Sequence, residues 1–496
     1  MKKSKLIKTG LGVAALAGVG VSMVRAATTY KTKPVENANI GAEEKVDVER
    51  FIKNLSDAIK IPTIANRDES LVDWAPFDEF HAFLESAYPL MHEKLEKQII
   101  STRSLLYHWK SEHPEKEPIA LLSHQDVVPV TPGTEDDWKY PAYSGEVAEG
   151  FLWGRGAIDM KNHLIGVCEA VETLLEEGYV PERDVYLCFG HNEEVMAEGE
   201  ICGADCMMRW FKERGIRLDS VLDEGGAILE AKVDKVIDGH LAGVGIAEKG
   251  HVDFEISVNA KGGHSSQPPK HSALGELSRI VCKLENNQFK AELTPQLYSL
   301  FNEIGKNTTY PVRCVMSNLP VLKPLVTKIC SEIPPVASMM RTTTAVTMAN
   351  GSPAPNVLPQ KASVNVNVRI YPGETIEDVT KHLRKVIKNK KAEINVKPGW
   401  KNPSKISPTD TRSFRIIEEI CMGMNSDNIV APYLVMGGTD ACHYERVCEN
   451  IYRYSPFLVN TGLLLTTHGT NERIPVSSMS DGVAFFKRFI RKASEK

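Results

Sequence analysis

Short apolar runs alternate with helical patterns in the first half of the chain. The runs at residues 119–122, 185–189 and 221–222 are typical of buried strands, whereas residues 163–179 and 204–214 have the apolar spacing of helices. Alternation of this kind predicts an α/β domain built on a sheet with parallel strands.

Beyond about residue 245 the pattern changes to strict alternation. Val252, Phe254, Ile256 and Val258 are apolar and the residues between them are polar, which indicates a half-exposed antiparallel strand. A helix, two strands, a helix and a strand are then expected, at residues 272–285, 342–348, 362–370, 375–388 and 392–396. This order predicts an α+β sandwich inserted into the first domain. The sequence therefore divides into a first domain in two parts and an inserted one, at residues 44–245 with 401–496, and 246–400.

The first residues form a separate unit. Four lysines among the first eight residues precede an uncharged, mostly apolar run at residues 9–24. Residues 1–26 are therefore expected to be a secretory signal or a retained N-terminal anchor, and the polar residues 27–43 a linker. The run is shorter than the ~20 residues of a membrane-spanning helix, which favours export. The ten cysteines argue the other way, because they show no disulfide framework, and exported proteins usually pair theirs.

Length and charge narrow the class of protein. A chain of 496 residues suggests two or three domains, and 42% hydrophobic residues suffice for a sizeable core. The net charge of -5 gives no indication of a nucleic-acid partner.

Acidic and histidine-bearing motifs stand where the predicted strands end. Because ligands gather at the carboxyl edge of parallel strands, the sequence predicts that these side chains meet in one crevice. They are His124, Asp126, Asp159, Glu193, Glu194 and Asp223. A hydrophobic core has no use for so many carboxylates, whereas a metal does. With His468 far downstream, the mixture of nitrogen and oxygen ligands suits zinc, as one or two ions.

Each motif taken alone has a simpler interpretation. His124 and Asp126 fit a surface turn, Asp159 fits a helix N-cap, the Glu193–Glu194 pair fits a solvated loop, and His468 fits a surface histidine. In a metal site, one member of the glutamate pair can bind the ion while the other takes a proton from water. The metal hypothesis therefore depends on the whole set.

The motifs resemble those of the zinc aminoacylase/carboxypeptidase superfamily, and within it the branch of carboxypeptidase S and N-fatty-acyl-amino-acid synthase/hydrolase. The resemblance runs from about residue 45 to the C-terminus. It rests on Ser-His-Gln-Asp-Val-Val-Pro-Val (123–130), Leu-Trp-Gly-Arg-Gly-Ala-Ile-Asp-Met-Lys (152–161), Gly-His-Asn-Glu-Glu-Val (190–195), Lys-Gly-Gly-His-Ser-Ser (261–266), Gly-Gly-Thr-Asp (437–440) and His-Gly-Thr-Asn-Glu-Arg-Ile (468–474). It implies a mixed-sheet zinc-peptidase catalytic domain of α/β class, with an inserted α+β sandwich that acts as a lid and dimerisation domain.

The resemblance also implies roles for individual residues. One zinc would be held by His124, Asp159 and Asp223, and the other by Asp159, Glu194 and His468, with Asp159 bridging. Which of Asp223 and Glu194 shares an ion with His124 stays open.

Further roles concern catalysis and substrate binding. Glu193 would be the general base, Asp126 would orient His124, and His264, often lent by a partner subunit, would stabilise the oxyanion. The pocket for a substrate carboxylate would contain Asn356, Arg369 and Gly438.

The sequence departs from the family pattern at one rim of the expected site. Asn192 stands where the family usually has Asp, and residues 195–202 replace a short glycine turn. The expected function is a di-zinc hydrolase of N-acyl amino acids or short peptides with a free C-terminal carboxylate. The alternatives are a dipeptidase that recognises a free amino end, a single-zinc enzyme, and a non-catalytic binding homologue.

Overall fold

The computed structural model describes residues 44–197, 199–233, 237–306, 308–425 and 427–495. The predicted signal or anchor at residues 1–26 and the linker at 27–43 lie outside them, so both stay predictions. Among the helices that are described, none has both the length and the apolar character needed to cross a membrane.

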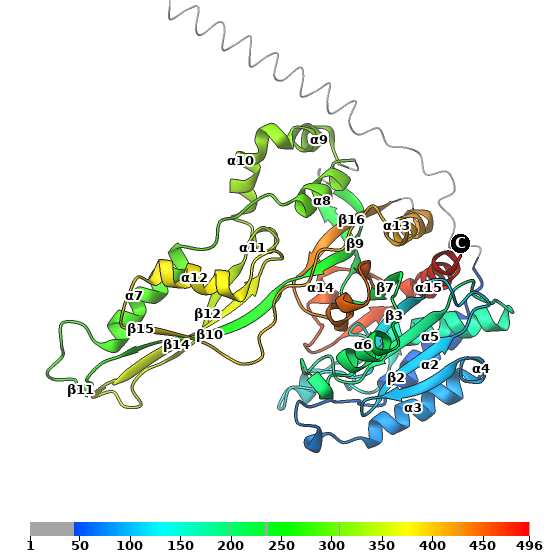
Figure 1. The fold of residues 1–496 in the computed structure, drawn as a ribbon, viewed down its shortest axis with the longest axis horizontal. Coiled ribbons are helices and arrows are strands. Elements are labelled where there is room, and N and C mark those ends of the chain that lie inside the picture. Colours follow the sequence, from blue (N-terminus) through cyan, green and yellow to red (C-terminus); the bar gives the residue numbers. More distant parts are fainter. Residues whose placement is uncertain (1–43, 198, 234–236, 307, 426, 496) are drawn as a thin grey trace, which may run out of the picture.

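A mixed sheet of ten strands forms the body of the protein (Figure 1). Its central strands β6, β3, β7 and β17 run parallel, whereas β1 and β2 extend the sheet antiparallel at one side. The strands in spatial order are β1 (Glu96–Ile100), β2 (Ser104–Trp109), β6 (Val185–Gly190), β3 (Ile119–His124), β7 (Ser220–Asp223), β17 (Ile451–Arg453), β9 (Ile237–Glu248), β8 (Ala227–Val233) and β18 (Leu458–Val459), with β16 (Asn428–Val435) beside β9. The predicted α/β class is therefore confirmed.

Helices cover both faces of the central strands. Ile119 and Leu121 of β3 belong to one buried cluster, and Ala120 and Leu122 belong to another on the opposite face, as the two-residue period of a strand requires. The first cluster includes α5 (Lys161–Glu176), α2 (Val48–Ile59), α3 (Ala75–Ala87), α4 (Pro89–Lys94), α13 (Arg412–Met424) and α15 (Met479–Ser494). The second includes α6 (Gly203–Glu213). A small sheet of β4 (Val147–Ala148), β5 (Phe151–Trp153) and β19 (Arg473–Pro475) stands beside the loop that carries Asp159.

A second sheet of four strands extends away from the body (Figure 1). Its order is β12 (Thr343–Asn350), β14 (Lys361–Ile370), β10 (Gly250–Asn259) and β15 (Ala392–Val396). The apolar residues expected to alternate on β10 are buried beneath α7 (Ala273–Asn286) and α12 (Ile376–Ile387), in a core separate from that of the main sheet. At the far end, β11 (Gly263–His264) pairs with β13 (Val357–Leu358).

The transition between the two sheets lies at Lys249, between β9 and β10. The domain limits expected from the sequence stay predictions, but one segment within 246–400 does not pack on the second sheet. It comprises α8 (Pro295–Lys306), α9 (Tyr310–Ser317), α10 (Leu319–Cys330) and α11 (Pro334–Ser338). These helices share a core with Ala431 of β16, so they cover the edge of the main sheet.

Candidate active site

Three neighbouring parallel strands end at the same edge of the main sheet, and the candidate residues follow them. His124 is the last residue of β3 and Asp223 is the last residue of β7, whereas Glu193 follows the end of β6. Asp159 reaches the same edge from the loop between β5 and α5. The crevice expected from the sequence is therefore present.

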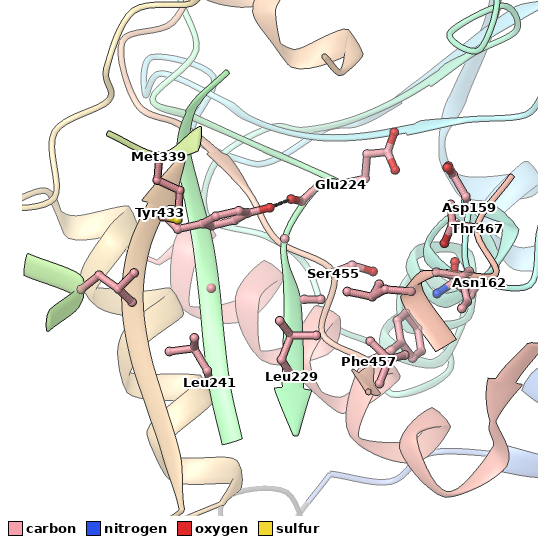
Figure 2. A pocket seen from close by; sticks show the side chains of 18 residues that line it. Asp159, Asn162, Glu224, Leu229, Leu241, Met339, Tyr433, Ser455, Phe457 and Thr467 are labelled. Atoms are coloured by element: carbon pink, nitrogen blue, oxygen red, sulfur yellow. Dashed lines mark hydrogen bonds between the residues drawn. The ribbon is translucent and has the colours of Figure 1, made fainter. Parts of the chain in front are cut away.

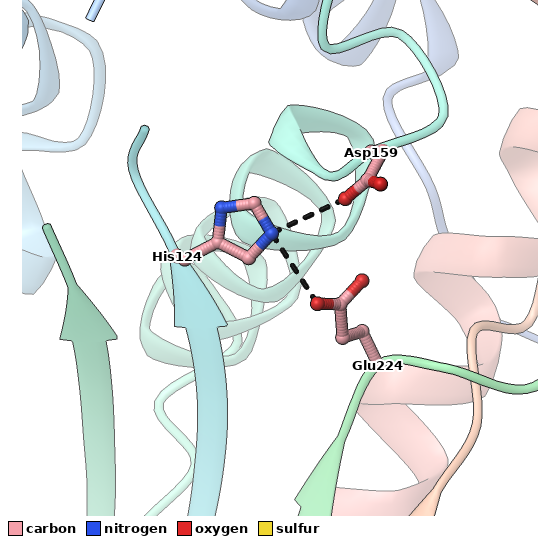
Figure 3. A group of neighbouring side chains, drawn as sticks. All are labelled: His124, Asp159 and Glu224. Atoms are coloured by element: carbon pink, nitrogen blue, oxygen red, sulfur yellow. Dashed lines mark hydrogen bonds and ion pairs between the residues drawn. The ribbon is translucent and has the colours of Figure 1, made fainter. Parts of the chain in front are cut away.

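The first group of possible metal ligands consists of His124, Asp159 and Glu224 (Figure 3). His124 Nε2 lies 3.2 Å from Asp159 Oδ1 and 3.3 Å from Glu224 Oε1. The other ring nitrogen, Nδ1, lies 2.9 Å from the backbone oxygen of Asp126. When Nδ1–H donates to this carbonyl, Nε2 carries no hydrogen and its lone pair faces the two carboxylates.

The second group consists of Asp159, Glu194 and His468. His468 Nε2 lies 3.0 Å from Asp159 Oδ2 and 3.0 Å from Glu194 Oε2. Asp159 thus presents one oxygen to each histidine, which is the geometry needed to bridge two ions. Glu194 lies in the group of His468 and not in that of His124, which favours one of the two pairings that the sequence left open.

Asp223 was expected as a ligand, but the structure places it in neither candidate group. Its carboxylate points to the backbone instead: Oδ1 accepts from the N–H of Glu224 and Oδ2 from the N–H of Ala441, both at 2.8 Å. The next residue along the chain, Glu224, enters the group of His124. The sequence shows two adjacent acids at this position, but it does not show which of them faces the crevice.

Asp126 positions both His124 and the two glutamates of the site. Its two carboxylate oxygens accept the backbone N–H groups of Glu193 and Glu194, each at 3.1 Å, and Oδ1 lies 3.4 Å from His124 Nδ1. The predicted role of orienting His124 thus fits the geometry. The hydrogen bonds between Asp126 and the backbone of the two glutamates were not predicted from the sequence.

Glu472 has a similar role for the loop that carries Asp159, a role that was not predicted from the sequence. Glu472 Oε1 accepts the backbone N–H groups of Gly156, Ile158 and Asp159 at 2.8–3.1 Å. Its other oxygen pairs with the buried Arg155 at 2.5 Å. A fully buried carboxylate from within the His468–Ile474 motif therefore fixes this loop.

A small cationic pocket of about 110 Å³ contains the predicted base Glu193. Arg369 of β14 and Gly438 line it, as the sequence predicted for the substrate carboxylate, and Lys249 and Lys401 line it as well. Met196, Ala197 and Cys202 of the unusual rim form part of its wall. Positive groups beside Glu193 suit an anionic end of the substrate.

A larger cavity of about 430 Å³ begins at Asp159 and Glu224 (Figure 2). Away from these two carboxylates its wall is mainly apolar, with Leu229, Leu241 and Phe457 among the lining residues. The acidic crevice therefore lies between two different pockets. Glu193 lines the cationic one, whereas Asp159 and Glu224 line the apolar one.

Comparison with known proteins identifies the family that has this architecture. The chain matches the model of peptidase family M20/M25/M40 over residues 120–492. The chain belongs to this family. The match includes all the ligands of both groups, so this M20 chain is a metal-dependent hydrolase, and the superfamily expected from the sequence is confirmed.

Relatives in the M20 family extend the match to most of the chain. The probable carboxypeptidase S-like 2 of Dictyostelium discoideum is 34% identical over 420 residues, which cover 84% of this chain and 80% of the relative. The N-fatty-acyl-amino acid synthase/hydrolase PM20D1 of Mus musculus is 31% identical over 462 residues, covering 91% and 88%. The crystal structure of the M20 metallo-carboxypeptidase Sso-CP2 from Sulfolobus solfataricus has the same fold, with a TM-score of 0.63, 16% identity, and coverage of 89% and 98%.

The electrostatics of the site fit a divalent metal. Burial raises the pKa of Glu224 from 4.5 to about 8 and also raises the pKa of Glu194, and the negative charge of Asp159 adds to both shifts. Hydrogen bonds to Asp159 and Glu194 raise the pKa of His468 to about 10. Too few positive charges face these acids, so bound cations would relieve the repulsion. Nitrogen and oxygen donors in each group match the preference of zinc.

Two of the predicted residues lie elsewhere in the chain. His264 and Asn356 line a separate pocket at the β11–β13 end of the second sheet, and both are exposed. Figure 1 shows that β11, which pairs with β13 beyond the end of this sheet, lies far from the body. Within one chain, the structure does not bring either residue to Glu193.

Proposed function

We propose that this chain is a di-zinc hydrolase that cleaves the amide bond of N-acyl amino acids with an apolar acyl chain and a free carboxylate. One observation carries the proposal: the acidic crevice lies between a cationic pocket and an apolar cavity. An N-acyl amino acid has the same order, with a carboxylate, an amide and a hydrocarbon chain.

Two zinc ions would occupy the two ligand groups and share Asp159. When bound, they supply Lewis acidity, which makes water acidic enough to react near neutral pH and stabilises negative charge on a carbonyl oxygen. The two histidines supply neutral nitrogen ligands, and the carboxylates compensate the charge of the ions.

Glu193 is the group that moves the proton. Its carboxylate lines the cationic pocket next to the ligand Glu194, and burial raises its pKa well above 4.5. A base with a raised pKa can take a proton from water and return it to the departing amine. Asp126 holds its backbone and so fixes where the carboxylate points.

Arg369 would orient the substrate from the same pocket. Its planar guanidinium can hold a carboxylate through two parallel hydrogen bonds, and Lys249 and Lys401 add positive charge nearby. With the carboxylate there, the amide reaches the crevice and the acyl chain enters the apolar cavity.

The apolar wall argues against a dipeptidase that recognises a free amino end. The α-ammonium of a dipeptide would lie beside Asp159 and Glu224, next to the amide, and would make no use of the wall formed by Leu229, Leu241 and Phe457, whereas a hydrocarbon chain would bury its surface there. The relative named N-fatty-acyl-amino acid synthase/hydrolase supports the acyl substrate.

His264 and Asn356 enter the proposal through a second copy of the chain. Because they lie at the distant end of the second sheet, they can serve a site only in a neighbouring subunit, so we propose a homodimer formed through this sheet. Mixing Glu193→Gln with His264→Ala subunits tests it. Random pairing restores about a quarter of wild-type activity if His264 is lent across the dimer, and none if it is not.

The test of the function is a substrate panel on the zinc-loaded protein. N-acyl amino acids should be hydrolysed faster than dipeptides with the same C-terminal residue, and faster than N-acyl amino acid amides. Glu193→Gln should lose roughly 10²–10⁴-fold in kcat while metal analysis finds both ions. Turnover by this variant at the wild-type rate would refute the general-base role.

A further inference from the structure

Helix α10 exposes a stripe of large apolar residues. Val321, Leu325 and Ile329 have 72%, 57% and 55% of their surface exposed, and their spacing of four residues puts them on one face of the helix. Figure 1 shows α9 and α10 projecting from the body beyond α8. Tyr310 and Val315 of α9, and Ile333 just after α10, are exposed apolar residues of the same projection.

The stripe is not needed to hold α10 in place. A different face of the helix, turned by roughly 120°, carries the buried residues Leu319, Val326 and Cys330, which share a core with Leu297 and Leu300 of α8. The body therefore covers only part of the apolar surface of α10, and the stripe stays exposed. A contiguous exposed apolar surface on a water-soluble fold marks an interaction site.

The charges of the projection are of one sign. Residues 310–330 contain three basic residues and no Asp or Glu, in a chain with a net charge of -5; the nearest acids along the chain are Glu303, which pairs with Lys306, and Glu332. Lys323 and Lys328 are exposed on α10 itself. A helix with large apolar residues and lysines is typical of one that lies in the interface of a membrane, where the lysines meet anionic headgroups.

The projection is also continuous with the apolar cavity of the site. Leu300 of α8 packs in the same core as α10 and lines the cavity that begins at Asp159. Met339, just after α11, lines it too. A membrane bound at α10 would therefore lie next to the elements that form the wall of this cavity.

We propose that the exposed face of α9 and α10 docks on the surface of a bilayer that contains anionic lipid, and that docking brings membrane-dissolved N-acyl amino acids to the cavity. The docking does not depend on the proposed function. The delivery of substrate rests on the proposed function.

The experiment measures partitioning of the full-length protein onto vesicles. Phosphatidylcholine vesicles with and without phosphatidylserine are the probes, and the test variant is Val321→Gln/Leu325→Gln/Ile329→Gln, in which glutamine preserves helix propensity. The matched control is Leu71→Gln/Ile99→Gln/Val180→Gln, which removes apolar residues of 68%, 54% and 56% exposure from the body. All variants retain residues 1–43, so any lipid affinity of that segment is common to them.

We expect the α10 variant to lose at least about tenfold in partitioning to both kinds of vesicle, and the control to match wild type. Lys323→Gln/Lys328→Gln should lose about tenfold on the anionic vesicles and little on the neutral ones. Equal partitioning of the α10 variant, the control and wild type would overturn the proposal. A change from dimer to monomer in the α10 variant with unchanged partitioning would overturn it as well, and would assign the stripe to a second copy of the chain.

A second measurement separates docking from the proposed function. The α10 variant should hydrolyse a short-chain N-acyl amino acid in solution at the wild-type rate, and a long-chain one in vesicles at least about tenfold more slowly. If no N-acyl amino acid is hydrolysed by wild type, the proposed function fails, while the partitioning result still decides the docking. Equal loss on the soluble and the vesicle-bound substrate would overturn the delivery role.

Discussion

Lengthening the acyl chain of the substrate should raise kcat/KM until the apolar cavity is filled. The cavity measures about 430 Å³, which is within the usual range of about 300–1,000 Å³ for small-molecule sites. Each methylene that leaves water for such a wall contributes about 0.8 kcal/mol, or roughly a fourfold gain in kcat/KM. From butanoyl to octanoyl, four methylenes give about 3 kcal/mol, an upper limit of roughly 200-fold.

The perturbation that tests the wall is Leu229→Trp. Leu229 lines the cavity from β8 and is only half-buried, so a larger side chain there takes up space without disturbing the core of the sheet. The indole should reduce kcat/KM for octanoyl substrates by about tenfold or more and leave butanoyl substrates nearly unchanged.

The assay compares initial rates for butanoyl, hexanoyl and octanoyl derivatives of one amino acid, below the concentration at which they form micelles. A matched control is Leu71→Trp, at an exposed leucine that does not line the cavity. A flat dependence of kcat/KM on chain length in the wild type would refute the assignment of this cavity to the acyl chain. An equal loss on all three substrates in Leu229→Trp would refute it too, because it would indicate general damage.

Three further predictions concern the polar side of the site. Arg369→Lys should lower kcat/KM for carboxylate substrates by roughly 10–100-fold, because the two-pronged contact is lost, and should leave the slow rate on the corresponding amides unchanged, as steady-state kinetics will show. Glu224→Gln should reduce the metal content after dialysis, whereas Asp223→Asn should retain both ions; the reverse result would restore the ligand set expected from the sequence. The pKa of Glu224 is raised to about 8, so the folded metal-free protein binds more protons than the unfolded one between about pH 5 and 8, and its stability should fall as the pH rises. Melting temperatures near pH 6 and pH 8 should therefore differ more with a chelator than with zinc.

The sequence predicted well those features that depend on local pattern. The helices expected at residues 272–285 and 375–388 are observed as α7 (Ala273–Asn286) and α12 (Ile376–Ile387), because their apolar spacing and their caps at Ser272 and Thr375 are local signals. The ends of the strands were equally predictable from the sequence. From them, most of the acidic groups could be assigned to one edge of the sheet.

Features that depend on side-chain direction or on long-range packing were not predictable. Whether Asp223 or Glu224 faces the crevice depends on the residue at which β7 ends, since neighbouring side chains at a strand end point in different directions. Likewise, nothing local in the sequence of α8 to α11 shows which of the two sheets they cover. Only the structure places them on β16 and makes them a wall of the cavity.

The excess of carboxylates over metal ligands has its own explanation in the structure. Asp126, Asp223 and Glu472 are buried and bind no candidate metal position, yet each accepts backbone N–H groups from loops that carry or adjoin the ligands. These contacts involve none of the candidate ligand atoms. The three acids therefore help to order the ligand loops, so the free energy of ordering them does not come from the ions alone. The same acids that suggested a metal centre in the sequence thus fall into two classes, those that face the ions and those that build the frame around them.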